Sequence, residues 1–431
     1  MKIAIAGYGL EGQVNYQYWA AKYPDAAITI VDQRPVSAPQ GVPTIIGEDA
    51  FAQLRGFDVV VRTAGLAPRF IKTDGKIWSG TNEFFEHCPA TIIGVTGTKG
   101  KGTTSSMIAS ILQTAGKTVH LVGNIGVPAL SMLETIHPDD IVVYEMSSFQ
   151  LWDITRSPKV AVVLGIEPDH LNVHKDMEDY VAAKGGIRRY QHDGDICIYH
   201  PTNRYATEIA HVTDAGMIQK YAVADDNGVY VHDNTFKIGD HTICSTDVMQ
   251  VPGVHNIENA CAAMTAARAI GIDDDALAEG LRRFEGLPHR LEFVREVDGV
   301  MFYNDSFSSA PAATVAAAKA LTQPEILILG GIDKGADFTE LADTLRDLPN
   351  IKAILVIGQI KEKLAAFLRD HGVTAVITEL DVKTMPDIVS AARRQATSGD
   401  VVLLSPGCAS FDMFRDFYDR GDQYREVVNQ L

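Results

Sequence analysis

A glycine-rich stretch with a lysine near its end offers the clearest chemistry in this sequence. Residues 96–104 read TGTKGKGTT, follow the apolar run TIIGV and precede a helical pattern. In such a loop, backbone N–H groups, a helix N-terminus and Lys101 all face one anion. The standard P-loop pattern would have glycine at position 95 and Ser or Thr at position 102. This sequence has Val95 and Gly102 there, so the loop is a variant of that pattern. We predict a triphosphate cradle; a plain basic turn is the alternative.

Polar residues at two strand ends could complete such a site with a metal ion. Glu145 ends the run IVVYE, and Asp169-His170 follow the run VAVVLGI. A triphosphate is bound together with Mg²⁺, which prefers oxygen ligands. Ligands of α/β proteins collect at the C-terminal ends of the strands, so these side chains are expected beside the loop. The sequence predicts metal ligation, the alternative being ordinary surface groups.

A second glycine motif lies at the start of the chain. Gly7-Tyr8-Gly9-Leu10-Glu11-Gly12 follows a strand-like run and opens a helical pattern, and Asp32 ends the next strand. This is the dinucleotide-binding fingerprint, in which glycines let the backbone approach a pyrophosphate. It predicts a nucleotide or a nucleotide-sugar diphosphate without deciding between them. A turn that binds no ligand is the alternative.

The elements that must position these residues alternate in type. Continuous Val/Ile/Leu runs separated by helical patterns are typical of strands buried on both faces of a parallel sheet. The fold class is therefore expected to be α/β. The runs are 3–7, 28–32, 58–63, 91–97, 141–147, 160–166, 325–331, 353–358 and 401–407.

Two interruptions of this alternation divide the chain. A proline-containing joint at 86–90 and the segment GLPHR at 286–290 predict three domains, at 1–89, 90–287 and 288–431. Between residues 221 and 243, short alternating runs with turn residues predict a small antiparallel insertion in the middle domain.

Composition limits the class of partner. The 431 residues carry 38 Lys and Arg against 55 Asp and Glu, a net charge of −17 that repels polyanions, so no nucleic-acid partner is expected. The five cysteines form no C-x-x-C pair, which favours a reducing compartment. No apolar stretch is long enough for a membrane span, and Met1 leads directly into a strand. We expect a cytoplasmic protein.

The order of motifs resembles the Mur ligase family of ATP-dependent amide-forming enzymes, most closely its MurD type. The resemblance spans all three expected domains. It implies a Rossmann-like N-terminal domain, a P-loop ATPase-like middle domain and a Rossmann-like C-terminal domain. It also implies that D-glutamate is added to UDP-N-acetylmuramoyl-L-alanine through an acyl phosphate, in peptidoglycan precursor synthesis, by a monomer. The matching motifs are TGTKGKGTT (96–104), GNIGVPAL (123–130), EMSSFQL (145–151), DH (169–170), AAK (182–184), GVHNIENA (253–260), GLPHR (286–290), NDS (304–306), GGIDKGADF (330–338) and SPGCASFDMF (405–414).

The resemblance also implies residue roles. Lys101, His170 and Lys184 would be catalytic. Two Mg²⁺ ions would be bound by Thr103, Glu145, His170 and a carbamylated Lys184. The residues implied to contact ATP are Gly97, Thr98, Lys99, Gly100, Lys101, Gly102, Thr103, Thr104, Asn256, Asn259, Arg290 and Asp305. Those implied for the nucleotide-sugar substrate are Gly9, Leu10, Asp32, Arg34, Asn124 and Ser147, and those for the amino acid are Lys334, Ser410 and Phe417.

Two departures from the family pattern leave questions open. Gly102 replaces a hydroxyl residue, as in the related folylpolyglutamate synthases, so Thr103 is expected to serve the metal. Phe307 stands where the family has a lysine near the amino-acid carboxylate, which leaves another amino acid, such as L-glutamate, as an alternative. An NAD-dependent oxidoreductase would explain the first glycine motif but neither the second loop nor Lys184.

Overall fold

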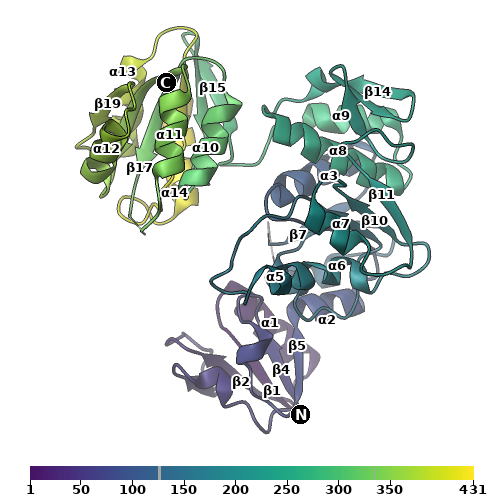
Figure 1. Cartoon of the computed structure of the whole chain (residues 1–431). Helices are drawn as coiled ribbons and strands as arrows, with labels where there is room; N and C mark the ends of the chain where they lie inside the picture. Colours follow the sequence, from purple (N-terminus) through teal and green to yellow (C-terminus); the bar gives the residue numbers. More distant parts are fainter. Residues whose placement is uncertain (125–127, 334) are drawn as a thin grey trace. The chain divides into compact units, whose positions relative to one another are not determined.

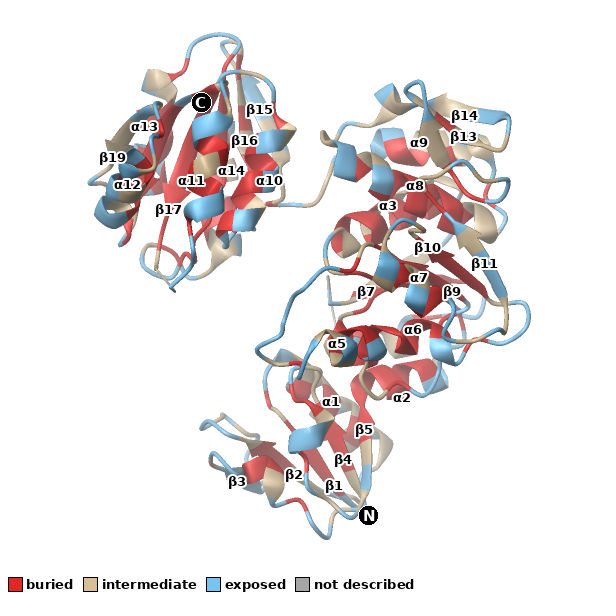
Figure 2. Ribbon diagram, in the orientation of Figure 1, coloured by how far each residue is buried: buried red, intermediate tan, exposed pale blue. Residues whose placement is uncertain are grey.

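The computed structural model describes residues 1–124, 128–333 and 335–431. They form two compact units, Met1–Val248 with Ile257–Arg283, and Met249–Asn256 with Phe284–Leu431. Figure 1 labels the elements of each unit. In both units the central strands of the large sheets are buried, while exposed residues gather on the edge strands and on the outer faces of the helices (Figure 2).

The first unit begins with a five-stranded parallel sheet in the order β3-β2-β1-β4-β5. Alternate residues of β1 pack into separate cores, Ala4 and Ala6 on one face and Ile3 and Ile5 on the other. Its strands are β1 (Lys2–Ala6), β2 (Ala27–Asp32), β3 (Thr44–Ile46), β4 (Val59–Arg62) and β5 (Lys76–Ser79). Its helices are α1 (Leu10–Lys22), η1 (Ala50–Ala52), η2 (Pro68–Phe70) and α2 (Gly80–His87).

A six-stranded parallel sheet follows, in the order β11-β10-β9-β6-β8-β7. The strands are β6 (Thr91–Thr96), β7 (Val119–Gly123), β8 (Ile141–Glu145), β9 (Val160–Val163), β10 (Ile196–Tyr199) and β11 (Met217–Lys220). Its helices are α3 (Lys101–Thr114), η3 (Ala129–Thr135), α4 (Ser148–Leu151), α5 (Met177–Lys184), α6 (Gly186–Arg189), α7 (Arg204–Ala210), α8 (Val254–Ala269) and α9 (Asp274–Arg283). The glycine-rich loop therefore joins β6 to α3, as in P-loop ATPases.

The antiparallel insertion is confirmed. The strands β12 (Tyr230–His232), β13 (Thr235–Ile238) and β14 (His241–Ser245) form a small sheet, and η4 (Thr246–Val248) follows them.

A buried arginine joins the two large sheets of the first unit. Arg62, at the end of β4, has no exposed surface and makes a bidentate ion pair with Asp153, which follows α4. Its guanidinium also donates to the carbonyl of Phe149 at 3.0 Å and to that of Leu66 at 3.2 Å. Because a buried guanidinium needs all its partners, this contact fixes the N-terminal sheet to the middle sheet.

The second unit contains a six-stranded sheet in the order β15-β16-β20-β17-β18-β19. Only the pair β15 and β16 is antiparallel. The strands are β15 (Glu292–Val297), β16 (Val300–Asn304), β17 (Glu325–Gly330), β18 (Ile351–Ile357), β19 (Val376–Glu379) and β20 (Val401–Leu404). The helices are α10 (Pro311–Ala320), α11 (Thr339–Asp347), α12 (Lys361–Asp370), α13 (Met385–Gln395) and α14 (Phe417–Asn429).

The α/β class is confirmed, and every expected apolar run contains a strand. The sheets change between α2 and β6, and the longer segment of the second compact unit begins at Phe284, but the boundaries after residues 89 and 287 stay predictions. Within the described residues, no helix combines the length and apolar character needed to cross a bilayer.

Candidate functional site

The phosphate loop has the shape that its glycines predict. Between β6 and α3 the backbone turns through Gly100, whose φ is +81°, a conformation that side chains other than glycine rarely adopt. A Cβ at this position would lie 2.4 Å from Oδ1 of Asn259. That same oxygen lies 3.2 Å from Thr104 Oγ1, which donates to it. The structure therefore brings Asn259 of α8 beside the loop.

Lys101 begins α3 and folds back over the loop. Its Nζ donates to the carbonyl of Thr98 at 2.9 Å and to that of Gly97 at 3.2 Å. Thr103 and Thr104, in the first turn of α3, are buried. A positive charge and a helix N-terminus thus lie at the same end of the loop, which favours an anion there.

Lys184 lies directly behind the loop. It is the last residue of α5, is 1% exposed, and donates from Nζ to the carbonyl of Gly97 at 2.8 Å. Burial lowers the pKa of this amine far below its ordinary value, and the charge of Lys101 lowers the pKa further. The carboxylates of Asp169 and Glu145 oppose that shift. This environment favours the neutral, nucleophilic form of the amine over the ammonium form.

Glu145 connects the loop region to the substrate residues. It is buried at the end of β8, and Oε1 accepts a hydrogen bond from Asn124 Nδ2 at 2.9 Å. The backbone N–H of Asn124 also donates to the Glu145 carbonyl at 3.0 Å. Two residues that were predicted for different tasks, metal binding and substrate binding, therefore touch.

Ser147 lies two residues after Glu145, at the N-terminus of α4. It caps α4 through a reciprocal capping box with Gln150, whose side chain accepts from the Ser147 backbone N–H at 2.9 Å. Leu10, Asn124 and Ser147 all line one cavity of about 340 Å³ between the two sheets of the first unit. The structure thus brings three of the predicted substrate residues together.

The other residues predicted at the N-terminal glycine motif lie outside that cavity lining. Asp32 uses its two carboxylate oxygens to accept the backbone N–H groups of Tyr8, at 2.8 Å, and Arg34, at 3.0 Å. Gly7 has a φ of +90°, and a Cβ there would lie 2.2 Å from Thr63 Oγ1. These contacts account for the motif as local structure; Gly9, Asp32 and Arg34 stay predictions for ligand binding.

His170 lies at the edge of the site. Its backbone φ is +55°, its side chain is about half exposed, and its ring centroid lies 4.9 Å from that of Phe149. Among the described residues, no group of three or more His, Cys, Asp or Glu side chains could hold a metal ion unaided. Mg²⁺ commonly takes only one or two protein carboxylates and completes its shell with phosphate oxygens and water. The buried carboxylate of Glu145, close to the phosphate loop, fits that mode of binding.

A Ser–His–Asp chain whose serine and histidine are buried was not predicted from the sequence. His174 Nε2 lies 3.0 Å from Ser148 Oγ, and Nδ1 lies 3.0 Å from Asp179 Oδ2. The order of these contacts, from serine to histidine to aspartate, is the same as in the catalytic triad of a serine hydrolase. However, Ser148 is only 2% exposed, and the His174 ring stacks on Phe149 at 5.5 Å. We interpret the chain as a tie that fixes α4 to α5, and so positions Lys184 at the end of α5.

Of the residues predicted for the second unit, Asp305 directly follows a strand of its sheet. Asp305 is buried after β16, accepts from Ser405 Oγ at 2.6 Å, and has its pKa raised to about 6 by burial. The Arg290 guanidinium lies 4.3 Å from the centre of the Phe307 ring, which also packs edge-on against Phe417. Asn256 donates to the Pro252 carbonyl at 2.6 Å. Lys334 lies outside the described residues.

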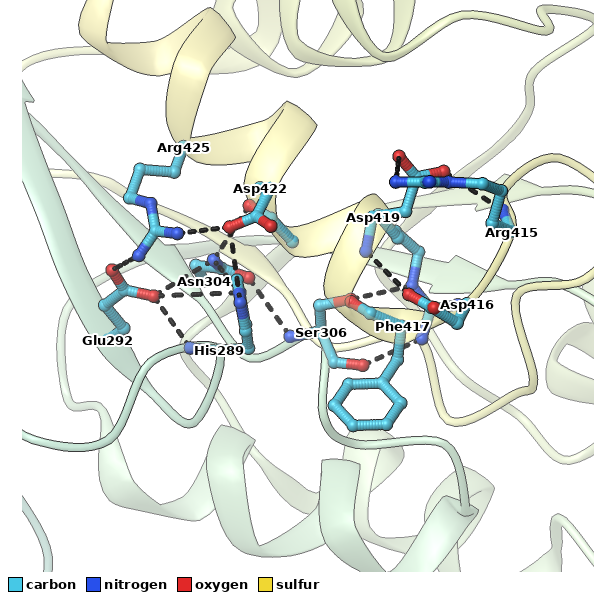
Figure 3. Close-up of polar contacts among 12 residues, drawn as sticks. His289, Glu292, Asn304, Ser306, Arg415, Asp416, Phe417, Asp419, Asp422 and Arg425 are labelled. Atoms are coloured by element: carbon cyan, nitrogen blue, oxygen red, sulfur yellow. Dashed lines mark hydrogen bonds and ion pairs between the residues drawn. The ribbon is translucent and has the colours of Figure 1, made fainter. Parts of the chain in front are cut away.

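The start of this unit is held by a polar network (Figure 3). Asn304 Nδ2 lies 3.0 Å from His289 Nδ1 and 3.1 Å from Glu292 Oε2. Ser306 Oγ donates to the Phe417 carbonyl at 2.8 Å, and buried Arg420 donates to that serine at 2.9 Å. Ser410 is also buried. The network therefore fixes the backbone at Phe417, one of the residues predicted for the amino acid.

Comparison with known proteins identifies the family. Residues 95–267 match the Mur ligase middle domain, and residues 289–408 match the Mur ligase, glutamate ligase domain. The UDP-N-acetylmuramoylalanine–D-glutamate ligase of Clostridium kluyveri is 37% identical, over 91% of this chain and 87% of that protein.

Two solved structures share the fold. MurF from Acinetobacter baumannii has a TM-score of 0.64 at 18% identity, covering 93% of this chain and 85% of that one. MurF ligase from Thermotoga maritima, solved in complex with ADP, has a TM-score of 0.58 at 17% identity, covering 99% and 93%. The matched domains, the 37% identity over most of the chain and the P-loop arrangement agree that the chain belongs to the Mur ligase family, and within it to the MurD type.

Proposed function

We propose that this protein is an ATP-dependent ligase that adds D-glutamate to UDP-N-acetylmuramoyl-L-alanine in peptidoglycan precursor synthesis. The observation that carries the proposal is the phosphate loop, with Lys101 over it and the buried Lys184 behind it. The name of the Clostridium kluyveri relative supports the choice of substrates. Because the reaction consumes ATP and the chain's cysteines are free thiols, we place it in the cytoplasm. We further propose that it acts as a monomer, as the family resemblance implies.

The first step forms an acyl phosphate. The carboxylate at the alanine end attacks the γ-phosphorus of ATP, the bond between that phosphorus and the β-γ bridging oxygen breaks, and ADP leaves. Phosphoryl transfer depends mainly on positioning and on charge stabilisation. Lys101 and the N–H groups of the loop supply that charge stabilisation, and Asn124 and Ser147 orient the peptide end. Asn256, Asn259, Arg290 and Asp305 are proposed to contact ATP.

Mg²⁺ would be held by Glu145, Thr103, His170 and a carbamylated Lys184, together with phosphate oxygens. When bound, it would neutralise the charge of the transferring phosphoryl group. The neutral amine of Lys184 is the form that can add to CO₂, and the resulting carbamate would be an anionic oxygen ligand. The charge of Asp169 also acts on Lys184.

The second step forms the amide bond. The free amino group of glutamate attacks the acyl carbon, the bond from that carbon to the phosphate oxygen breaks, and inorganic phosphate leaves with the amine proton lost to the surroundings. Ser410, Phe417 and Lys334 are proposed to bind the amino acid. Phe307 cannot supply the cation of the family lysine, so glutamate should bind with a relatively high KM.

A phosphate-release assay tests the function. The full chain, ATP, Mg²⁺ and UDP-N-acetylmuramoyl-L-alanine are combined with each amino acid in both enantiomers. We expect release to require every component and to be fastest with D-glutamate. Preference for L-glutamate or a neutral amino acid would replace the amino acid while keeping the ligase chemistry, whereas no release with any of them would contradict the proposal.

A further inference from the structure

Arg69 links the N-terminal sheet to the turn that follows His170. It lies in η2, which comes after β4, and belongs to none of the predicted sites. Its Nη2 donates to the carbonyl of Val173. Val173 is part of a tight turn, because its own N–H and that of His174 both donate to the His170 carbonyl at 2.9 Å. An arginine of the N-terminal part of the chain therefore holds the turn that carries a predicted metal ligand.

The same guanidinium reaches α5. Its Nη1 lies 3.9 Å from Asp179 Oδ2, and its central carbon lies 5.5 Å from the centre of the Trp152 ring. Trp152 packs on His174 with ring centroids 4.4 Å apart, and His174 Nδ1 lies 3.0 Å from Asp179 Oδ2. Arg69 thus contacts α5 directly through its charge and indirectly through two packed rings.

The helix α5 connects these contacts with the phosphate loop. The hydroxyl of Tyr180, the residue after Asp179, lies 3.1 Å from Thr98 Oγ1. At the end of the helix, Lys184 donates to the carbonyl of Gly97 at 2.8 Å. Because a helix is a rigid element, a shift at Asp179 changes the placement of both contacts.

The other end of the link lies beside the cavity of the first unit. Ala64 and Gly65 line that cavity and precede Arg69 in the same segment. The segment is held to β4 by Arg62, which donates to the carbonyls of Ala64 at 3.3 Å and Leu66 at 3.2 Å. A ligand in the cavity therefore contacts the segment that places Arg69.

The link is built from partly exposed side chains. The side chain of Arg69 is 31% exposed and that of Asp179 is 27% exposed, so their ion pair contributes little to the stability of the fold. Ordering a long arginine side chain costs conformational entropy. A ligand that orders one end of the link lowers this cost for a second ligand at the other end, and the result is positive cooperativity.

Resting on the proposed function, we propose that Arg69 is a positioning residue that makes the sugar-nucleotide substrate and Mg²⁺-ATP bind cooperatively. The substrate orders the segment before Arg69, and Mg²⁺-ATP orders α5 and the turn after His170. By thermodynamic linkage, each ligand then raises the affinity of the other by the same factor.

Calorimetry on the full chain measures this cooperativity without turnover. The probes are UDP-N-acetylmuramoyl-L-alanine and a non-hydrolysable ATP analogue with Mg²⁺, each titrated alone and in the presence of the other. In the wild type, the first ligand should lower the Kd of the second about tenfold, which is usual for coupled sites. Arg69→Gln should reduce this factor to about twofold or less, while the Kd of each ligand alone changes little.

The matched control is a second arginine that joins the same two parts of the first unit. Arg156 lies before β9, is exposed, and donates from Nη2 to Glu86 Oε1 of α2 at 2.8 Å. Arg156→Gln should keep the wild-type factor. If Arg69→Gln does not fold, Asp179→Asn removes the same ion pair and should lower the factor in the same way. The double variant should lose no more than either single variant, because both changes remove one contact.

Other outcomes overturn the inference. Independent binding of the two ligands to the wild type would show that there is no cooperativity. A wild-type factor in Arg69→Gln, or additive losses in the double variant, would show that Arg69 does not act through Asp179. Equal weakening of both ligands with an unchanged factor would assign Arg69 a structural role only.

The ligase function and the role of Arg69 can fail separately. Cooperative binding that depends on Arg69, in a chain that releases no phosphate with any amino acid, would contradict the ligase function alone. Normal turnover in a chain whose cooperativity is the same with and without Arg69 would contradict the role of Arg69 alone.

Discussion

Lys184 combines two properties that rarely occur together in a lysine. Its amine is buried against the phosphate loop, and the cation of Lys101 adds to the desolvation that lowers its pKa. Lysines are seldom fully buried unless paired, because the ammonium form loses its hydration. The carbamylation proposed above would convert this amine to an anionic ligand and release one proton.

Carbamylation of Lys184 can be measured without activity. Carbon-13 bicarbonate supplied to the wild-type chain should give a carbamate carbonyl resonance that Lys184→Ala abolishes. Lys184→Ala should also be nearly inactive and partly restored by short carboxylic acids, while Lys184→Arg keeps a cation and should not be restored. A wild-type spectrum identical to that of Lys184→Ala, at saturating bicarbonate, would show that the lysine stays unmodified.

Lys101 should be essential for phosphoryl transfer. Lys101→Ala removes the cation held over the loop, where oriented charge typically contributes about 3–4 kcal/mol to the transition state. We expect kcat to fall by about two orders of magnitude or more, with an unchanged circular dichroism spectrum. Lys117→Ala is the control, because this lysine is exposed after the other end of α3 and is predicted for no ligand. If Lys101→Ala keeps more than about a tenth of the wild-type kcat, this loop is not the ATP site.

Glu325 should make the second unit less stable at neutral pH than at acid pH. It has no exposed surface, neither carboxylate oxygen has a hydrogen-bond partner among the described residues, and burial raises its pKa to about 8. The folded state therefore binds this proton more tightly than the unfolded state, so stability is lost as pH rises from about 4.5 towards 8. The total loss is on the order of 4–5 kcal/mol.

Glu325→Gln should remove that loss. Urea unfolding of both proteins at pH 5 and pH 8 is expected to show a stability gain for the variant that is larger at pH 8. Asp305, whose pKa is raised to about 6, changes stability in the same direction but is present in both proteins. A difference that is equal at the two pH values would mean that Glu325 does not titrate in this range.

At the scale of elements, the turn between β6 and α3 depends on the backbone freedom of one glycine. Gly100→Ala introduces both a strained φ and a Cβ that would overlap Oδ1 of Asn259. Gly116→Ala is a matched control, because its φ is +75° and its Cβ would meet nothing within 4 Å. We expect the KM for ATP to rise about tenfold or more in Gly100→Ala and to change little in Gly116→Ala. Similar KM values in the two variants would show that contact with Asn259 is unimportant.

The strands that carry the site could be predicted because their residues are buried on both faces. Runs such as Ile141–Glu145 are continuously apolar up to the functional residue, and that pattern needs no tertiary information. Strands at sheet edges were missed: β3, β11 and β19 are short and partly exposed, so they lack the pattern. The alternating burial of β15 likewise did not predict an antiparallel pair in the last sheet.

The side-chain contacts of the site were less accessible to sequence reasoning. The role of Lys101 in phosphate binding could be predicted because the lysine and the glycine-rich loop lie in one continuous segment of sequence. The chain from Ser148 through His174 to Asp179 was not, because its members lie on separate elements and only the fold brings them within 3.0 Å. The burial of Asn15 without a partner for its amide likewise follows only from packing of α1.

For the whole molecule, two compact units predict two unfolding transitions. Each unit has its own buried cores, and chains of this kind depart from two-state behaviour. UDP-N-acetylmuramoyl-L-alanine is proposed to bind the first unit alone. At about 100 times its Kd it should raise the first unit's Tm by roughly 5 °C. Differential scanning calorimetry with and without the ligand checks this, and an equal shift of both transitions would argue against separate units.

The ion pair between Arg62 and Asp153 limits how freely such ligases can be recombined. One partner ends a strand of the N-terminal sheet and the other follows α4 of the middle sheet. A chimera that joins this middle sheet to a foreign N-terminal sheet would leave Asp153, whose side chain is 22% exposed, without its guanidinium partner, at a cost of up to about 3–5 kcal/mol. It would also leave the Phe149 carbonyl without its donor. Exchange of N-terminal domains, by recombination or by design, therefore has to transfer residues 62 and 153 as a pair. The suitable breakpoint lies after residue 153 and not at the change of sheets.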